Sequence, residues 1–333
     1  MPYESLHASN TAISWIIPVR DGRQWLGAAV GSVIPQLRPS DEIIVIDDGS
    51  QTSPRDLLPQ DPRVRLLVQP PLGIVAALER GRKEANGAFL GRLDADDLAL
   101  PNRAELHRRF LVEHPEVGAV GGQARLQGSL GEGMKLYVEW INGLTCLHKV
   151  LLVESPLFHP AVTMRAAAVR GVGGYRLGDF PEDYDLWLRL VQDGWRLANI
   201  PKPVVEIRDH EARLTRTDSR YSRGAFRYLK MAYMTKLLKD TRPKIAVWGA
   251  GRGGRPWIRW ALQQPGSLVA VVDSFISSSR YGYVVTPPEV LSSMELDLLI
   301  VAVGSRGARE KIRTNLKDIR PDLVEGKDWL AVC

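Results

Sequence analysis

Apolar runs and amphipathic segments alternate through the first hundred residues. Residues 13–19 are mostly apolar and residues 43–46 wholly so, as in parallel strands that are covered on both faces. Residues 25–33 place apolar side chains on one face of a helix, and residues 73–85 predict a second helix. Residues 64–68 predict a further strand. This succession of strands and helices predicts an α/β fold.

Acidic residues follow several of these strands. Asp21, Asp48, Asp94 and Asp96 each come just after an apolar run. Parallel α/β sheets bind ligands beyond the carboxyl ends of their strands, so these four side chains would share one cleft. For Asp48 the alternative is an Asx turn beside Gly49.

The stretch after the apolar pair Phe89-Leu90 carries the strongest chemical signal. Asp94, Asp96 and Asp97 lie close together there, and carboxylates so crowded repel one another. A hard divalent cation, Mn²⁺ or Mg²⁺, would compensate them and would also bind phosphate oxygens. The alternative is a solvated acidic turn.

The pattern after residue 100 predicts further elements of both kinds. A helix that begins near Glu182 has acidic residues in its first turn, where they would complement the helix dipole. A late strand ends at Asp209-His210. The other predicted elements are a helix at 101–114, a strand at 118–120, a glycine-rich loop at 128–133, and the late strand itself at 199–201 and 204–208.

Composition narrows the classes of protein. The chain has 333 residues, 44% of them hydrophobic and 25% charged, with a formal net charge of +6. These values suit a globular protein of two domains with anionic partners. Two cysteines exclude a disulfide framework and favour a reducing compartment. Residues 1–10 do not predict a signal peptide, and no apolar run approaches the about 20 residues of a membrane span, so we expect a cytoplasmic protein.

A strongly basic segment follows the first domain. Residues 213–242 contain nine Lys and Arg residues but only two Asp residues, and apolar residues recur there at helical spacing. We interpret residues 216–242 as a basic amphipathic helical linker with a solvated basic face. The alternative is peripheral contact with an anionic membrane, on its inner face, where the helix would present a lipid-linked acceptor. Nucleic-acid binding is disfavoured because the segment matches no recognised motif.

Residues 243–333 predict a second, small Rossmann-like domain. Gly249, Gly251 and Gly254 form a G-x-G-x-x-G pattern between a strand and a helix, and the next strand ends at Asp273. The pattern indicates a loop that binds phosphate or a second nucleotide at the helix N-terminus. The alternative is that the glycines only allow close packing of strand and helix.

The order of motifs in residues 1–215 resembles that of family 2 glycosyltransferases of the GT-A fold. The resemblance covers roughly residues 11–215, and the motifs that carry it are Trp15 to Gly22, Val45 to Ser50, Gly73, Leu93 to Asp97 and Pro101. It implies an inverting, metal-dependent transfer of sugar from a nucleoside-diphosphate sugar, UDP-linked by preference. The acceptor would be a carbohydrate, lipid-linked or protein hydroxyl, in surface polysaccharide or glycoconjugate synthesis.

The resemblance also implies roles for single residues. Asp48 would hydrogen-bond the base, Pro18 and Arg20 would line the nucleotide pocket, and Asp94 would contact ribose or metal. Asp96 would bind the metal ion that bridges the diphosphate. Many relatives have an aromatic residue and Asn where Arg20-Asp21 stands here, which bears on base selectivity.

The same resemblance extends to the later motifs. Asp183, in the Glu-Asp pair after a Gly-Gly-Tyr, would be the catalytic base. Glu182 and His159 would lie on the acceptor side, and His210 would close the metal or diphosphate site. Two other classes of protein stay open: a non-enzymatic nucleotide or nucleotide-sugar sensor, and an NAD-dependent oxidoreductase that acts through the second domain.

Overall fold

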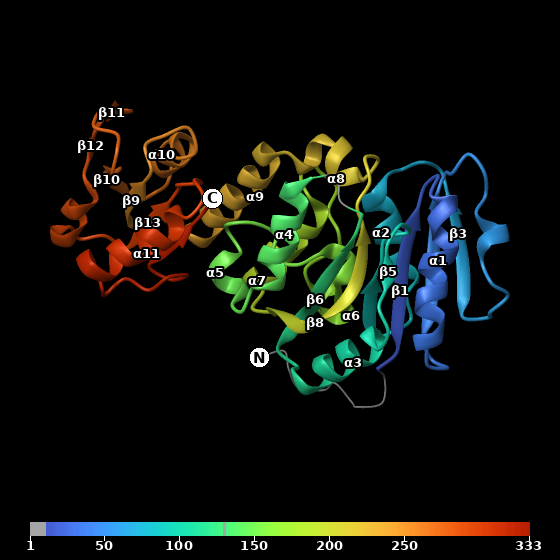
Figure 1. Ribbon diagram of the computed structural model, residues 1–333. Helices are drawn as coiled ribbons and strands as arrows, with labels where there is room; N and C mark the ends of the chain where they lie inside the picture. Colours follow the sequence, from blue (N-terminus) through green and yellow to red (C-terminus); the bar gives the residue numbers. More distant parts are fainter. Residues whose placement is uncertain (1–10, 129–130) are drawn as a thin grey trace. The chain divides into compact units, whose positions relative to one another are not determined.

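The computed structural model describes residues 11–128 and 131–333, which form two compact units (Figure 1). The first comprises Met1–Leu147 with Pro156–Ser222, and the second His148–Ser155 with Arg223–Cys333. Residues 1–10, for which no signal peptide was predicted, lie outside the described residues. So do two residues of the predicted 128–133 loop, and α4 begins at Glu132.

An eight-stranded mixed sheet forms the centre of the first unit. Its order is β3-β2-β1-β4-β7-β6-β8-β5, and β1 to β4 are parallel neighbours. The strands are β1 (Ile13–Val19), β2 (Glu42–Asp48), β3 (Val64–Gln69), β4 (Phe89–Arg92), β5 (Leu98–Ala99), β6 (Val117–Gln127), β7 (Thr163–Arg165) and β8 (Arg196–Arg208). The predicted α/β character is confirmed.

Alternation along β1 explains why helices cover both faces of the parallel part. Trp15 and its neighbours at i±2 pack in one core with α1, whereas Ile16 points to the other face. There α2 comes so close that a Cβ at Gly81 would lie 2.6 Å from Ile16 Cγ2. The helices and 3₁₀ turns of this unit are α1 (Arg23–Val33), η1 (Ile34–Gln36), η2 (Arg55–Leu57), α2 (Ile74–Glu84), α3 (Arg103–Glu113), α4 (Glu132–Asn142), η3 (His159–Ala161), α6 (Ala166–Gly171), α7 (Glu182–Gln192), α8 (Leu214–Thr217) and η4 (Ser219–Tyr221).

Strands β6 and β8 are longer than the sequence pattern predicted. β8 is one strand of thirteen residues even though it contains Pro201 and Pro203. Proline cannot donate a ladder hydrogen bond, and the register between β6 and β8 shifts on both sides of Gln123, which pairs with Pro203. This irregularity lets the strand pass the prolines and continue to Arg208, next to the acidic stretch.

The second unit contains a six-stranded sheet of order β11-β12-β10-β9-β13-β14. Every pairing in it is parallel except that of β11 with β12. Its elements are α5 (Leu147–Val150), α9 (Arg223–Leu237), β9 (Lys244–Trp248), α10 (Arg255–Leu262), β10 (Ser267–Val272), β11 (Ser279–Arg280), β12 (Tyr283–Thr286), η5 (Pro288–Ser293), β13 (Leu298–Val301), α11 (Ala308–Ile319) and β14 (Trp329–Ala331).

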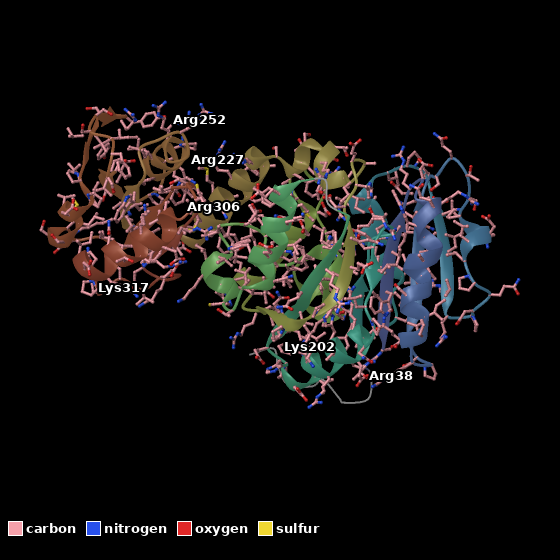
Figure 2. All side chains as sticks on the ribbon, viewed as in Figure 1. Arg38, Lys202, Arg227, Arg252, Arg306 and Lys317 are labelled. Atoms are coloured by element: carbon pink, nitrogen blue, oxygen red, sulfur yellow. The ribbon has the colours of Figure 1, made fainter. Side chains whose placement is uncertain are left out.

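Helix α9 carries part of the basic segment but does not expose all of it. Lys230 is buried and its Nζ donates to the main-chain oxygens of Val153 (2.7 Å) and Val332 (3.2 Å). Figure 2 shows basic side chains spread over both units; the labelled ones are Arg38, Lys202, Arg227, Arg252, Arg306 and Lys317. Within the described residues, every helix is too short or too polar to cross a bilayer. Contact of α9 with a membrane surface stays the alternative to a solvated basic face.

A buried histidine makes stability depend on pH. His107 on α3 is fully buried, its Nδ1 lies 2.8 Å from Thr163 Oγ1, and its Nε2 has no hydrogen-bond partner among the described residues. Burial, with Arg103 nearby, lowers the pKa of His107 well below its usual 6.5. The folded chain therefore keeps this imidazole neutral, while the unfolded chain binds a proton below that pH.

We expect this difference to cost stability as the pH falls. One such group can remove up to about 1.4 kcal/mol of unfolding free energy for each pH unit below its unfolded pKa, and none of this loss occurs well above it. Buried carboxyls with raised pKa values, such as Asp97 and Glu182, act in the opposite direction. Urea unfolding of wild type and His107→Gln at about pH 7.5 and about pH 5.5 isolates the histidine. Equal pH dependence of the two proteins would contradict the assignment.

Candidate active site

The ends of three parallel strands define one edge of the first sheet. β1 ends before Arg20-Asp21, β2 ends at Asp48, and β4 ends just before Asp94. Because β2 and β4 both pair with β1 in parallel, these residues share that edge, and a common cleft there stays a prediction. Asp21 also joins the first two turns: its amide donates to Ser50 Oγ (2.9 Å), and its carboxylate accepts from the Gln51 amide (2.8 Å).

The acidic turn (Asp94, Asp96 and Asp97) brings its three carboxylates together. Each offers one oxygen such that all three lie within 4.8 Å of one another. The side chains of Asp94 and Asp96 are 28% and 20% exposed, whereas that of Asp97 is 0% exposed. The turn therefore presents two carboxylates outward and one inward.

Asp97 anchors the end of β8 to the turn. Its Oδ1 accepts from the Arg208 amide (2.9 Å) and from Arg213 Nη1 (3.3 Å). Its Oδ2 is buried and has no hydrogen-bond partner in the part of the chain that the structure describes. Burial, and repulsion from Asp94 and Asp96, raise the pKa of Asp97 well above its usual value. A cation beside the turn would relieve this repulsion.

Basic residues surround the two outward carboxylates. Arg92 Nη2 lies 2.5 Å from Asp94 Oδ1, and Arg213 lies 3.8 Å from the other oxygen. Although burial opposes ionisation, Arg92 and Arg213 hold the pKa of Asp94 below its usual value. His210 Nε2 is 2.7 Å from Asp96 Oδ2, and its ring stacks at 4.4 Å on Trp25. His210 thus stands beside the residue predicted to bind metal.

Asp48 holds the turn that opens α2. Its Oδ1 accepts from Gln69 Nε2 (2.7 Å) and the Leu72 amide (2.9 Å), and its Oδ2 from the Gly73 amide (2.9 Å). Gly73 has φ +91°, which disfavours any side chain there. Pro18 is buried in β1 and Arg20 is exposed just beyond it. These long-range hydrogen bonds of Asp48 therefore order residues 69–73 at the same edge of the sheet.

The predicted base lies in the first turn of α7. The Asp183 Oδ1 accepts from the Tyr184 amide at 2.7 Å, and the preceding Glu182 is 3% exposed. His159, also buried, places Nδ1 3.8 Å from Glu182 Oε1 and Nε2 2.9 Å from the Tyr175 hydroxyl. Glu182 and His159, predicted on the acceptor side, are thus members of one buried polar cluster.

This cluster connects α7 with the acidic turn. Burial raises the pKa of Tyr175; Arg92 opposes that shift, and the carboxylates of Glu182 and Asp183 add to it. Tyr175 is therefore within electrostatic reach of Arg92, which binds Asp94, and of Asp183.

Comparison with known proteins decides the family. Residues 14–170 match the model of Glycosyl transferase family 2. The first unit is a family 2 glycosyltransferase domain, and the chain is a glycosyltransferase. This confirms the resemblance drawn from the motifs.

Three relatives show how far the similarity extends. An uncharacterized glycosyltransferase of Haemophilus influenzae is 28% identical over 65% of this chain and 82% of its own length. An amylovoran biosynthesis glycosyltransferase of Erwinia amylovora is 28% identical, over 53% and 68%. A UDP-Gal:alpha-D-GlcNAc-diphosphoundecaprenol beta-1,3-galactosyltransferase of Escherichia coli is 27% identical, over 58% and 71%.

The glycosyltransferase domain uses residues that the motifs did not single out. Asp97 lies in the acidic stretch, but its inward anchoring role has no sequence signal. Arg213 was counted only among the basic residues after the domain, yet its side chain contacts Asp97 and is 10% exposed. Arg92 is buried, and its Nε and Nη1 have no hydrogen-bond partner among the described residues.

Hydrogen bonds to Asp273 and close backbone packing at Gly254 stabilise the glycine-rich turn of the second unit. Asp273 accepts from the amides of Ala250 (2.8 Å), Phe275 (2.9 Å) and Ile276 (3.1 Å). A Cβ at Gly254 would lie 1.7 Å from the Gly249 carbonyl oxygen, so only glycine allows this approach of helix to strand. These contacts give Gly249, Gly254 and Asp273 a structural function; ligand binding by Gly251 and its neighbours stays a prediction.

Proposed function

We propose that this glycosyltransferase moves a sugar from a nucleoside-diphosphate sugar, UDP-linked by preference, to an acceptor hydroxyl with inversion at the anomeric carbon. The observation that carries the proposal is the convergence of three carboxylates within 4.8 Å at the strand ends, with His210 2.7 Å from one of them. A sensor or an oxidoreductase would not require such a cluster together with a second acidic site on α7.

The donor set suits a divalent cation. Carboxylate oxygens and an imidazole nitrogen are ligands that Mn²⁺ and Mg²⁺ accept. Beside them, the buried Oδ2 of Asp97 has no hydrogen-bond partner among the described residues. Asp96 and His210, with Asp94 beside them, would hold the ion. When bound, it supplies Lewis-acid stabilisation of the charge that develops on the leaving diphosphate.

Asp183 is the proposed general base. Its carboxylate takes the proton of the acceptor hydroxyl while that oxygen bonds to the anomeric carbon and the bond to the diphosphate breaks. One displacement with no covalent intermediate inverts the centre. Two separate groups of residues would thus manage the two charges of the reaction. Asp183 on α7 takes the proton of the acceptor, and the acidic turn serves the negative charge of the leaving diphosphate.

Pro18, Arg20, Asp48 and Asp94 would form the nucleotide pocket. All four lie at the edge where β1, β2 and β4 end, and Asp48 orders the adjoining residues 69–73. The relative from Escherichia coli is named for a UDP-galactose donor and a lipid-diphosphate-linked acceptor, and that from Erwinia amylovora for polysaccharide synthesis. We therefore propose a UDP-linked donor and an acceptor in polysaccharide or glycoconjugate synthesis.

A donor panel tests the proposal. We expect the purified chain with Mn²⁺ to release nucleoside diphosphate from one UDP sugar faster than from the others, and EDTA to suppress this release. UDP-glucose, UDP-galactose, their N-acetylated forms and GDP-mannose form the panel, with NAD⁺ and NADH binding measured alongside. Binding of NAD(H) without release from any sugar nucleotide would favour the oxidoreductase alternative instead.

A further inference from the structure

Residues 209–222 form a strap that leaves β8 beside the acidic turn. Residues 211–222, all of which the structure describes, are exposed or half-buried. Polar contacts hold the amino end: His210 with Asp96 at 2.7 Å and Arg213 with Asp97 at 3.3 Å. Segments held in this way, without apolar burial, belong to the parts of a protein that open most easily.

A tyrosine attaches the other end of the strap to α7. The Tyr221 hydroxyl lies 2.9 Å from Glu182 Oε2 and 3.1 Å from Oε1. Glu182 is the first residue of α7, is 3% exposed and directly precedes Asp183. The strap therefore has one attachment at the proposed metal site and another beside the proposed base.

We propose that Tyr221 and Glu182 are positioning residues for sugar transfer: their hydrogen bond fixes the first turn of α7 against the strap and so holds Asp183 at a constant distance from the acidic turn. This inference rests on the proposed functions of Asp183 and Asp96. The hydrogen bond adds no ligand to the donor site; it sets where the base stands relative to that site.

The surroundings of Tyr221 support this arrangement. Burial raises the pKa of Tyr221, and the carboxylates of Glu182 and Asp183 raise it further, so the phenol stays a neutral donor close to both. Two other hydrogen bonds anchor the amino end of the strap. The Arg208 amide donates to Asp97 Oδ1 (2.9 Å), and the Asp209 amide donates to the Gln127 carbonyl oxygen (3.0 Å). Loss of the Tyr221 hydroxyl would therefore release only the end beside α7.

Hydrogen exchange of the full chain tests the attachment directly. We expect Tyr221→Phe to speed amide exchange in peptides from residues 211–222 by about 10-fold, the factor that one hydrogen bond to a carboxylate corresponds to. Tyr228→Phe is the matched control, because Tyr228 is 61% exposed on α9. Exchange in these peptides at the wild-type rate in Tyr221→Phe would overturn the proposal.

Kinetics separate positioning from general damage. Tyr221→Phe should lower kcat of transfer about 10-fold and leave the Kd of UDP with Mn²⁺ within about 2-fold, because the nucleotide and metal ligands are untouched. An unchanged kcat, or a Kd that weakens as much as kcat falls, would contradict the positioning role. If wild type releases no nucleoside diphosphate from any donor, the proposed function fails, while the exchange result still decides whether the strap is attached here.

A double-mutant cycle assigns the effect to the pair. If the two side chains act through one hydrogen bond, Tyr221→Phe in the Glu182→Ala background should speed exchange by less than about 2-fold. A further 10-fold acceleration in that background would show that Tyr221 acts elsewhere. Should Glu182→Ala not fold, Tyr221→Phe alone decides the matter, because it removes a single oxygen atom.

Discussion

Replacing Asp183 by Asn is expected to reduce sugar transfer by about 10²- to 10⁴-fold, the usual contribution of a general base. An amide cannot accept the proton of the acceptor hydroxyl at neutral pH. It does keep the size of the side chain and an oxygen for the Tyr184 amide, which donates to Asp183 Oδ1 at 2.7 Å. The fold of α7 and the affinity for UDP with Mn²⁺ should therefore stay near their wild-type values.

Initial rates of nucleoside diphosphate release, with calorimetry of UDP binding, measure both parts of this prediction. Asp193→Asn is a matched control, since Asp193 is exposed just beyond the other end of the same helix. Transfer by Asp183→Asn at the rate of wild type would show that another group takes the proton.

Replacing Asp96 by Ala is expected to remove the Mn²⁺-dependent part of the affinity for UDP. The change deletes the carboxylate that lies 2.7 Å from His210 and leaves Asp94 in its ion pair with Arg92. We expect UDP to bind at least 10-fold more weakly in the presence of Mn²⁺. This is the lower end of the loss in metal affinity that follows when a group supporting a metal site is removed. In EDTA, wild type and variant should bind UDP alike.

Calorimetric titrations of UDP with Mn²⁺ and with EDTA provide the four values needed. Asp318→Ala serves as the control, because Asp318 is exposed on α11 in the second unit. If Asp96→Ala kept the full difference between Mn²⁺ and EDTA, the metal would bind elsewhere and the acidic turn would have another function.

Local sequence patterns were sufficient where a segment is buried on both faces. The apolar run of residues 13–19 predicts β1 with its observed bounds, Ile13–Val19, and the strand predicted before Gly249 is β9, Lys244–Trp248. Both strands have parallel neighbours on either side, and packing on two faces there requires continuous apolar residues. The acidic turn was equally visible, because three crowded carboxylates need a compensating charge wherever the chain places them.

Pairings between distant polar residues could not be predicted in the same way. Tyr221 and Glu182 are 39 residues apart, and neither belongs to a periodic pattern that indicates the other. From the sequence, Arg213 was interpreted only as one more cation of the basic segment. Its contact with Asp97 arises because β8 continues past Pro201 and Pro203 to the acidic turn. Such contacts depend on how whole elements pack, which hydrophobic periodicity does not encode.

The second unit takes one of its pieces from the middle of the chain. Residues His148–Ser155 belong to it, and the Val153 carbonyl accepts from the buried Lys230 ammonium. A fragment that starts at residue 223 would leave this ammonium short of an acceptor, and one that stops at residue 222 would keep the apolar residues Leu151 to Val153 without the partners that cover them. A single cut in the chain would therefore not give two fragments that each fold correctly, and the enzyme has to be produced and studied as the full chain.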